Sequence, residues 1–321
     1  METLLQKFRA VSEPTRMRLL ALCAEEELTV KDLTEILGQP QSGISRHLRQ
    51  LCESQLLERR QEGTWAFYKI SSDGFGRRVA RSILDLLPTG DDQLALDRER
   101  LRILRRDRAS EAELLFSELA PRWDEVRKFH VDEVNVESAL KQCLSGREVT
   151  DLLDVGTGTG RVLELMAADI KRGVGIDTSR GMLGLARTKL RNARAKNCHA
   201  RFGDMYKVPF ARASFDVVVI HMVLHYAEEP ARVLKEASRV LRPGGQLVVV
   251  DFAAHQLEFL RKDYAHRRLG FEDTEMAAWF QTADLKFENF ATLKGGELTV
   301  VVWVGRLGTM PLSTKYARSF W

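Results

Sequence analysis

The 321-residue sequence predicts an α/β protein in which a small helical domain with a β-hairpin precedes a larger domain built on a mainly parallel sheet. Three observations predict this class. Apolar side chains recur at helical spacing between residues 4 and 51. Two β-prone runs, Leu57–Gln61 and Trp65–Ile70, flank a short turn. From residue 151 onward, short apolar strands alternate with helical patterns, and the length allows two separate cores.

Composition places limits on function. The net charge is only +4, so any binding to nucleic acid must depend on local clusters of basic residues. The four cysteines lack CxxC spacing, which predicts reduced thiols and neither a disulfide framework nor a zinc site. There is no N-terminal signal pattern and no apolar run of membrane-spanning length. We therefore expect a cytoplasmic protein without a membrane partner.

The first domain is predicted as a series of short helices. Ser12–Thr15 has the pattern of a helix start, with proline in the first turn. Thr29–Asp32 has the pattern of a capping box. Gly38–Pro40 makes a tight turn before a helix over residues 41–51, and the β-hairpin follows. Two helices joined by a glycine-containing turn, and then a hairpin, describe a winged helix-turn-helix.

These features resemble the ArsR/SmtB family of bacterial repressors over about residues 3–87, which implies binding to double-stranded DNA. Short polar side chains and an arginine on the early part of the second helix can reach base edges: Gln41, Ser42, Ser45 and Arg46. Basic residues nearby and on the hairpin are expected to hold phosphates: Arg49, Arg59, Arg60 and Lys69. The alternative is a solvated charged face on a protein-interaction domain.

The resemblance also raises the questions of metal sensing and of dimerisation, since both are properties of the family. The positions that match the family's thiol site, Leu28–Asp32, contain no cysteine, and Gly74–Asp85, which matches its other site, contains no histidine. No metal is therefore expected. Family members dimerise through their first and last helices, and the corresponding apolar residues here are Leu4, Leu5, Phe8, Val79, Ile83 and Leu87. A two-fold homodimer implies a pseudo-palindromic operator.

A connector is predicted to begin where Pro88–Asp92 breaks the preceding helix. The arginine-rich stretch over residues 98–108 either touches DNA flanks or forms an exposed helix that pairs with its own acids. Trp123, in an aromatic stretch, either closes over the cofactor of the next domain or anchors packing. The expected boundaries are 1–88 for the winged helix, 89–145 for the connector and cap, 146–306 for the second domain and 307–321 for a tail.

The second domain is organised around a glycine-spaced turn. The strand Asp151–Val155 runs into glycines at 156, 158 and 160, and a helix begins at Arg161. Glycines there let backbone amides approach a ligand, and the helix start adds free N–H groups. The spacing departs from that of dinucleotide dehydrogenases. The next strand ends in Asp177, which suits a ribose diol.

The order of motifs over residues 112–306 resembles the class I S-adenosylmethionine (SAM) dependent methyltransferases. Their fold is a Rossmann-like, mainly parallel sheet with a terminal antiparallel hairpin, here expected near residues 287–304. The resemblance implies that Asp177 holds the ribose, Met182 packs on the adenine, and Asp204 takes the adenine amino group beside Met205. The rest of the implied cofactor-binding set is Asp154, Gly156, Thr157, Gly158, Gly160 and Trp123. Loop capping is the alternative role for Asp177 and Asp204.

Two histidines, His221 and His225, follow the fourth strand at the edge where substrates bind in such sheets, and they are the candidate catalytic residues. They could act as a general base or as a polar pair lining the pocket. Their spacing would suit two metal ligands, but no third ligand is indicated. Methyl transfer depends strongly on alignment, so it does not require a base.

Two functions remain open from the sequence. The first is a transcriptional repressor whose methyltransferase-type domain binds SAM or its product S-adenosylhomocysteine (SAH) as an effector, similar to regulators of the SAM and methionine cycle. The second is an active small-molecule methyltransferase that also regulates its own gene. Residues after the fifth strand either shape an acceptor pocket or form a solvated face: His255, Tyr264, His266, Arg267 and Arg268.

Overall fold

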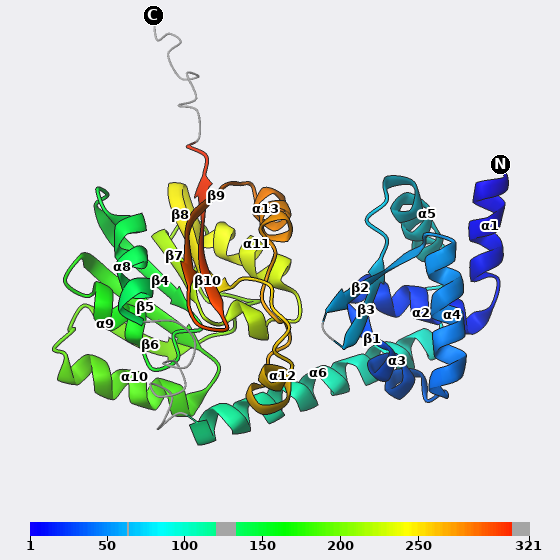
Figure 1. Ribbon diagram of the computed structural model, residues 1–321, viewed down its shortest axis with the longest axis horizontal. Coiled ribbons are helices and arrows are strands. Elements are labelled where there is room, and N and C mark those ends of the chain that lie inside the picture. The colour runs from blue at the N-terminus through cyan, green and yellow to red at the C-terminus, as the bar shows by residue number, and fades with distance from the viewer. Residues whose placement is uncertain (63, 120–132, 310–321) are drawn as a thin grey trace, which may run out of the picture. The chain divides into compact units, whose positions relative to one another are not determined.

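The computed structural model describes residues 1–62, 64–119 and 133–309 (Figure 1). Its internal contacts form two compact units, one spanning Met1–Ala112 and one beginning at Glu113. The division falls inside helix α6 (Asp92–Leu119), whereas the sequence suggested a first boundary at residue 88. The expected domain limits stay a prediction. Among the described residues, no helix combines the length and apolarity needed to cross a bilayer.

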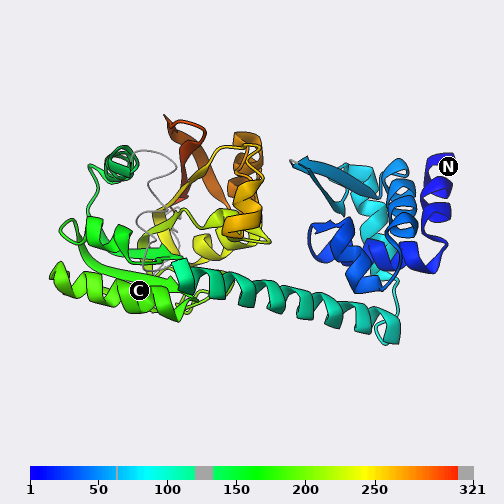
Figure 2. The same cartoon turned by 60° about the horizontal axis from the view of Figure 1, so that its bottom comes forward.

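The N-terminal unit consists of helices and a small antiparallel sheet of order β1-β3-β2. Its elements are α1 (Glu2–Val11), α2 (Pro14–Glu25), β1 (Leu28–Thr29), α3 (Val30–Leu37), α4 (Gln41–Glu53), β2 (Leu57–Glu62), β3 (Trp65–Ile70), α5 (Gly74–Asp85) and the first part of α6. Figure 2 shows β2 and β3 extending together from the helices of this unit. The predicted helix-turn-helix and hairpin are both present.

Local sequence explains where these helices begin and end. The Glu13 carboxylate accepts the backbone N–H groups of Thr15 and Arg16 at the start of α2, so Glu13 is the cap. Thr29 and Asp32 form the predicted capping box of α3. Gly38 ends α3 with φ of 66°, the left-handed conformation that glycine adopts at low cost. Helices α3 and α4 therefore meet at a defined turn.

The arginines of α6 contact acidic groups and a carbonyl of the N-terminal unit itself. Arg105 pairs with Glu26, Arg108 pairs with Asp32, and the Arg100 guanidinium donates to the carbonyl of Ile36. Leu101 and Leu104 are buried in the same core. Exposed Arg102 pairs with Glu99 of the same helix, as the second alternative from the sequence expected, but neither alternative describes the other three arginines. The first part of α6 is instead packed into the winged-helix core.

The C-terminal unit is a seven-stranded sheet of order β6-β5-β4-β7-β8-β10-β9. The pairs among the first five strands of that order are parallel, and β10 is antiparallel to both of its neighbours. Its strands are β4 (Val149–Val155), β5 (Ile170–Asp177), β6 (Cys198–Phe202), β7 (Phe215–His221), β8 (Leu241–Phe252), β9 (Leu285–Lys294) and β10 (Thr299–Leu307). The predicted mainly parallel sheet with a terminal antiparallel hairpin is confirmed.

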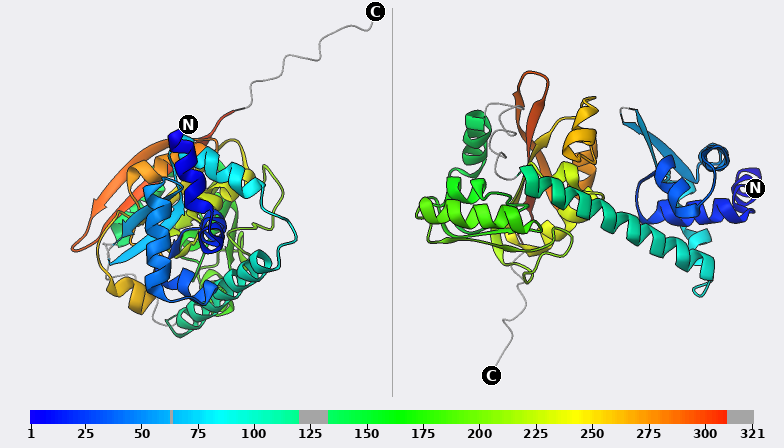
Figure 3. Two further views of the ribbon diagram at one scale, coloured as in Figure 1. Left: turned by 90° about the vertical axis from the view of Figure 1, so that its right-hand side faces the viewer. Right: turned by 90° about the horizontal axis from the view of Figure 1, so that it is seen from below.

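Helices cover both faces of this sheet (Figures 1 and 3). Two separate apolar cores result, one beneath α8, α9 and α10 and one beneath α11 and α13. The helical elements are α8 (Glu133–Leu144), α9 (Arg161–Met166), α10 (Arg180–Asn192), η2 (Leu224–Tyr226), α11 (Pro230–Val240), α12 (Phe259–Tyr264) and α13 (Asp273–Thr282). Strands β4, β5, β7 and β8 are parallel, so their carboxyl ends meet at one edge, where ligands bind in such sheets.

Candidate functional site

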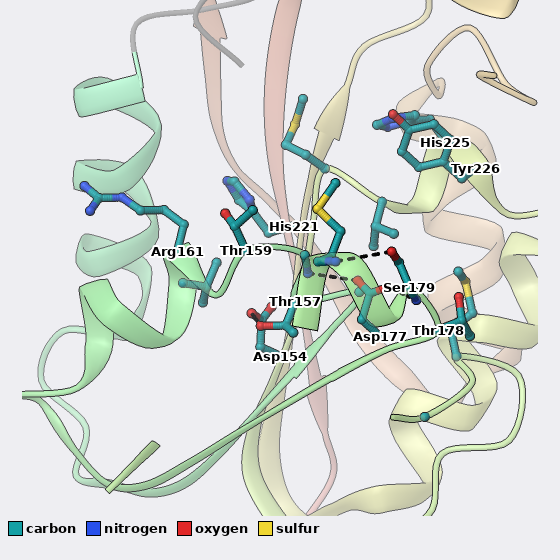
Figure 4. Close-up of a pocket in the computed structure, with 18 of the residues that line it drawn as sticks. Asp154, Thr157, Thr159, Arg161, Asp177, Thr178, Ser179, His221, His225 and Tyr226 are labelled. Carbon is teal, nitrogen blue, oxygen red and sulfur yellow. Dashed lines mark hydrogen bonds between the residues drawn. The ribbon is translucent and has the colours of Figure 1, made fainter. Parts of the chain in front are cut away.

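A pocket lies at the carboxyl ends of β4, β5, β7 and β8 (Figure 4). One part of it is lined by residues of the glycine turn, the end of β5 and the start of α10, and another by residues that follow β7 and β8. The lining residues are Asp154, Gly156, Thr157, Gly158, Thr159, Arg161, Val162, Asp177, Thr178, Ser179, Met182, Gly203, Met205, His221, Met222, Val223, His225, Tyr226, Phe252, Tyr264 and His266. Most of the predicted site residues therefore come together.

The glycine turn exposes backbone to the pocket because its glycines adopt left-handed conformations. Gly156 has φ of 70° and Gly158 has φ of 51°. A Cβ added at Gly156 would lie 2.5 Å from Cγ2 of Val223, whereas a Cβ at Gly158 would meet nothing within 4 Å. Gly156 is thus required by packing, and the open space at Gly158 fits the approach of a ligand to the backbone.

Replacing Gly156 by alanine is expected to destabilise the C-terminal unit by about 2–4 kcal/mol, because the left-handed backbone and the clash with Val223 both add cost. Gly158→Ala is the matched control, with only the conformational cost of about 1–2 kcal/mol. Hydrogen exchange of the β4 and β5 amides measures the loss of stability in both variants. Equal protection losses in the two variants would contradict the assigned packing role.

The carboxylate of Asp177 lies between the glycine turn and α10. Oδ2 accepts the N–H of Gly158 at 2.9 Å, and Oδ1 accepts the N–H of Ser179 at 2.8 Å. Burial raises the pKa of Asp177, and these backbone donors oppose that shift. Each oxygen has a further lone pair, so the carboxylate can also accept two hydroxyl hydrogens. This is the donor–acceptor match that a ribose diol needs.

Asp154 is buried at the end of β4, and its Oδ2 accepts the hydroxyl hydrogen of Thr157 at 2.6 Å. This bond ties the strand to the glycine turn. Arg161, at the start of α9, also lines the pocket, but its guanidinium is ion-paired with Glu137 and Glu164. Charged groups at this part of the pocket are therefore held in place by partners within the fold.

Met182 and Met205 line the pocket with Gly203, as expected for the region of an adenine ring. Asp204, however, is exposed and is absent from the lining, and its Oδ1 accepts the N–H of Tyr206. Gly160 is absent as well: a Cβ there would lie 3.1 Å from Cβ of Ala186, so it permits close packing of α9 on α10. Trp123 lies outside the described residues.

Both predicted catalytic histidines line the pocket, and His225 is paired with Asp251 at the end of β8, with Nδ1 and Oδ1 2.7 Å apart. Tyr264 and His266 also line the pocket, whereas Arg267 and Arg268 serve as donors to the backbone carbonyl of His225 through their own N–H groups. Sequence reasoning missed Asp251, Tyr226 and Phe252. A carboxylate in the otherwise apolar run Leu247–Phe252 was the available signal.

The second candidate site is helix α4 with the hairpin. Exposed polar residues share one face of α4, at Gln41, Ser42, Arg46 and Arg49, with Ser45 partly exposed between them. Arg59 on β2 is exposed, and it donates to the side-chain oxygen of Gln61. Arg60 and Lys69 were predicted to hold phosphates. Within the fold Arg60 pairs with Glu27 and Glu62, and Lys69 pairs with Glu27 and Glu58, while their contact with phosphate stays a prediction.

Comparisons with known proteins agree with this two-part organisation. Residues 11–60 match a family model described as a helix-turn-helix domain, and residues 153–249 match one described as a methyltransferase domain. The chain is 31% identical over 158 residues to the ubiquinone/menaquinone biosynthesis C-methyltransferase UbiE of Geobacter sulfurreducens. It is 32% identical over 145 residues to a demethylmenaquinone methyltransferase of Listeria welshimeri.

These matches are partial. They cover 47% of this chain and 61% of the Geobacter protein, and 43% of this chain and 60% of the Listeria protein. Among solved structures, a chain of the Haloferax volcanii complex between the Trm112 methyltransferase activator and a methyltransferase has a TM-score of 0.50. At 22% identity, with 60% of this chain and 97% of that chain covered, it shows the fold alone.

The chain therefore combines an N-terminal helix-turn-helix with a C-terminal methyltransferase-type domain. The predicted cofactor, SAM or its product SAH, is the cofactor class of that fold. The backbone of the glycine turn, the Asp177 carboxylate, and Met182 and Met205 fit such a compound. Bound there, SAM would supply an electrophilic methyl group on a sulfonium. The described residues include no group of three or more candidate metal ligands, and the expectation of a metal-free site stays a prediction.

Proposed function

We propose that this protein is a DNA-binding transcriptional regulator whose C-terminal domain takes SAM or SAH as its effector. The observation that carries the proposal is the combination, in one chain, of an exposed polar face on α4 with a pocket built for an adenosyl compound. The regulator acts as a repressor of the ArsR type, and the genes it controls serve the SAM and methionine cycle.

The recognition face supports binding in the major groove. Gln41, Ser42, Ser45, Arg46 and Arg49 follow the spacing of one helix face, and the apolar Ile44, Leu48 and Leu51 lie buried on the other. An α-helix fits the major groove, where arginine and short polar side chains distinguish base pairs. The bases are read by α4, and Arg49 and Arg59 hold phosphates at its sides.

The proposed DNA-bound species is a homodimer on a pseudo-palindromic operator. Of the apolar residues predicted for its seam, Leu5 and Phe8 on α1 are exposed, whereas Val79 and Ile83 on α5 belong to the core of their own unit. Phe75 and Leu86 extend the exposed apolar surface at the two ends of α5. The proposed dimer interface is therefore formed by the exposed apolar residues Leu5, Phe8, Phe75 and Leu86.

An effector changes DNA affinity only if it binds the DNA-competent and DNA-incompetent states unequally. The test first selects an operator from random duplexes with the full chain, and then measures operator binding with and without saturating SAM or SAH. Calorimetry gives the affinity of each ligand. We expect both to bind and at least one to change operator affinity at least fivefold. Unchanged operator affinity at saturation would contradict the effector role.

Replacing Arg46 by alanine is expected to weaken binding to the selected operator about 10–100-fold, because a base contact by arginine is worth about 1–3 kcal/mol. Binding to a scrambled duplex should change only a few-fold, since that affinity depends on phosphates and salt. Arg102→Ala removes the same charge from an exposed position on α6 and is the control. Equal losses on operator and scrambled DNA would argue that Arg46 contacts phosphate only.

A second candidate function, methyl transfer to a small molecule, is favoured by the part of the pocket beyond the donor site. An effector pocket needs only to hold the adenosyl compound, yet here it continues past the glycine turn to His221, His225 and six further aromatic or apolar residues. The relatives named above carry methyltransferase names. Mass spectrometry of a metabolite extract incubated with the protein and labelled SAM tests this function.

A further inference from the structure

A buried histidine–aspartate pair lies in the part of the pocket that follows β7 and β8. The side chains of His225 and Asp251 are 3% and 0% exposed. Asp251 Oδ1 is 2.7 Å from His225 Nδ1 and also accepts the N–H of Phe252, while its Oδ2 accepts the backbone N–H of His225. Three nitrogens thus surround one carboxylate, and the orientation of the imidazole is fixed.

The other ring nitrogen of His225 has no such partner. Nε2 is buried and makes no hydrogen bond to any residue within the described ranges. An ionised carboxylate only accepts, so Nδ1 carries the hydrogen and Nε2 keeps its lone pair. A buried polar atom without a hydrogen bond costs about 1–3 kcal/mol, which a purely structural pair would avoid. Because His225 lines the cofactor pocket, a group bound there can satisfy Nε2.

The surroundings of this nitrogen indicate what can bind. The His225 ring lies against the rings of His266 and Tyr226, with centroids 4.0 Å and 4.1 Å away, and Figure 4 shows His225 beside Tyr226. Phe252 and Tyr264 line the same part of the pocket, with Met222 and Val223. Among the described residues that line the pocket at and after the ends of β7 and β8, none is Lys, Arg, Asp or Glu. A flat, largely apolar molecule would find aromatic rings to stack on in this part of the pocket.

We propose that His225 is the catalytic base of a methyl transfer, that Asp251 is its positioning residue, and that the acceptor is a planar, largely apolar molecule with a phenol-type hydroxyl. This inference depends on the second function proposed above and names its acceptor class. A phenol has a pKa of about 10, so at neutral pH it is protonated and a weak nucleophile. A base positioned at its hydroxyl typically contributes about 10²–10⁴-fold in rate.

The step balances without further reactants. The acceptor oxygen forms a bond to the methyl carbon, the bond between that carbon and sulfur breaks with its electron pair left on sulfur, and neutral SAH results. The acceptor proton moves to Nε2 of His225. The Asp251 carboxylate stabilises the imidazolium until solvent removes the proton. The same pair could not act if Nε2 carried a hydrogen, so the tautomer is a direct test.

The first experiment uses the full chain with labelled SAM and two probes, catechol and 1,4-dihydroxynaphthalene, and detects methylated product by mass spectrometry. His225→Gln should lower the transfer rate at least 100-fold and leave the dissociation constant of SAH within threefold. Asp251→Asn should lower the rate about 10–100-fold. His199→Gln, an exposed histidine on β6, is the control and should transfer at the wild-type rate.

The second experiment reads the tautomer independently of turnover. In the SAH complex with ring-¹⁵N-labelled histidine, the resonances missing from His225→Gln identify His225, and we expect protonated Nδ1 and unprotonated Nε2. Adding 1,4-dihydroxynaphthalene should shift Nε2, and Asp251→Asn should change the tautomer. A hydrogen on Nε2, or transfer by His225→Gln at the wild-type rate, would overturn the proposal. If the wild-type chain bound SAH but methylated neither probe, the proposed acceptor class would be overturned. If the wild-type chain did not bind SAH, the proposed SAM site itself would be overturned.

Discussion

Asp177→Ala is expected to weaken SAH binding at least 100-fold. In our proposal both carboxylate oxygens accept ribose hydroxyls, and each hydrogen bond to a charged group is worth about 1.5–3 kcal/mol. The variant also releases the N–H groups of Gly158 and Ser179, which the carboxylate now holds at 2.9 and 2.8 Å. The glycine turn would then be less ordered, and the ligand would have to order it on binding. Calorimetric titration of SAH into the full chain measures the change.

Two variants make this result interpretable. Asp177→Asn keeps one acceptor oxygen and should lose less affinity than Asp177→Ala. Asp169→Ala removes an exposed carboxylate of the same unit, one that pairs with Lys141 at 3.7 Å, and should bind SAH normally. If Asp177→Ala bound SAH as tightly as the wild type, the adenosyl pocket and the effector role would both be refuted. The helix-turn-helix would be unaffected by that outcome.

Much of the fold was predictable because its signals are local. The capping box at Thr29 and Asp32, the left-handed Gly38 and the glycine turn after β4 each depend on residues only a few positions apart. The mainly parallel character of the sheet followed from the alternation of β and α patterns, since parallel strands need crossover helices. The sequence therefore located the pocket without knowledge of any long-range contact. This applies in particular to the part formed by the glycine turn, the end of β5 and the start of α10.

The remaining features depend on partners that are distant in sequence. Asp251 could be paired with His225 only once β7 and β8 were known to be neighbours. Arg60 was predicted to hold phosphate because its charge is visible in the sequence, but its partner Glu27 is 33 residues away. Gly160 belongs to the same glycine run as Gly156, and its contact with Ala186 on α10 gives it a packing role. A pattern of charge or glycine shows which groups are present, but not which contacts they make.

The same dependence on distant partners underlies the largest stability effect that we expect. Asp97 on α6 is 1% exposed, and it accepts two hydrogen bonds from the guanidinium of Arg18 on α2, at 2.6 and 2.7 Å. The guanidinium holds a fixed fork geometry that matches a carboxylate, which favours this paired arrangement. Asp97→Ala leaves the largely buried Arg18 without its counter-ion. Breaking a buried pair in this way costs about 3–5 kcal/mol.

We therefore expect Asp97→Ala to lower the free energy of unfolding of the N-terminal unit by about 3 kcal/mol or more, measured by hydrogen exchange of the α2 amides in the full chain. Glu99→Ala is the control on the same helix. It breaks the exposed pair with Arg102, and exposed pairs are worth at most about 1 kcal/mol. The double change Arg18→Met with Asp97→Leu removes both charges and should recover most of the loss. An effect of Asp97→Ala no larger than that of Glu99→Ala would mean that α6 is not anchored by this pair.

Operator affinity should fall with α2 stability, because α2 packs on α4, which carries the proposed recognition face.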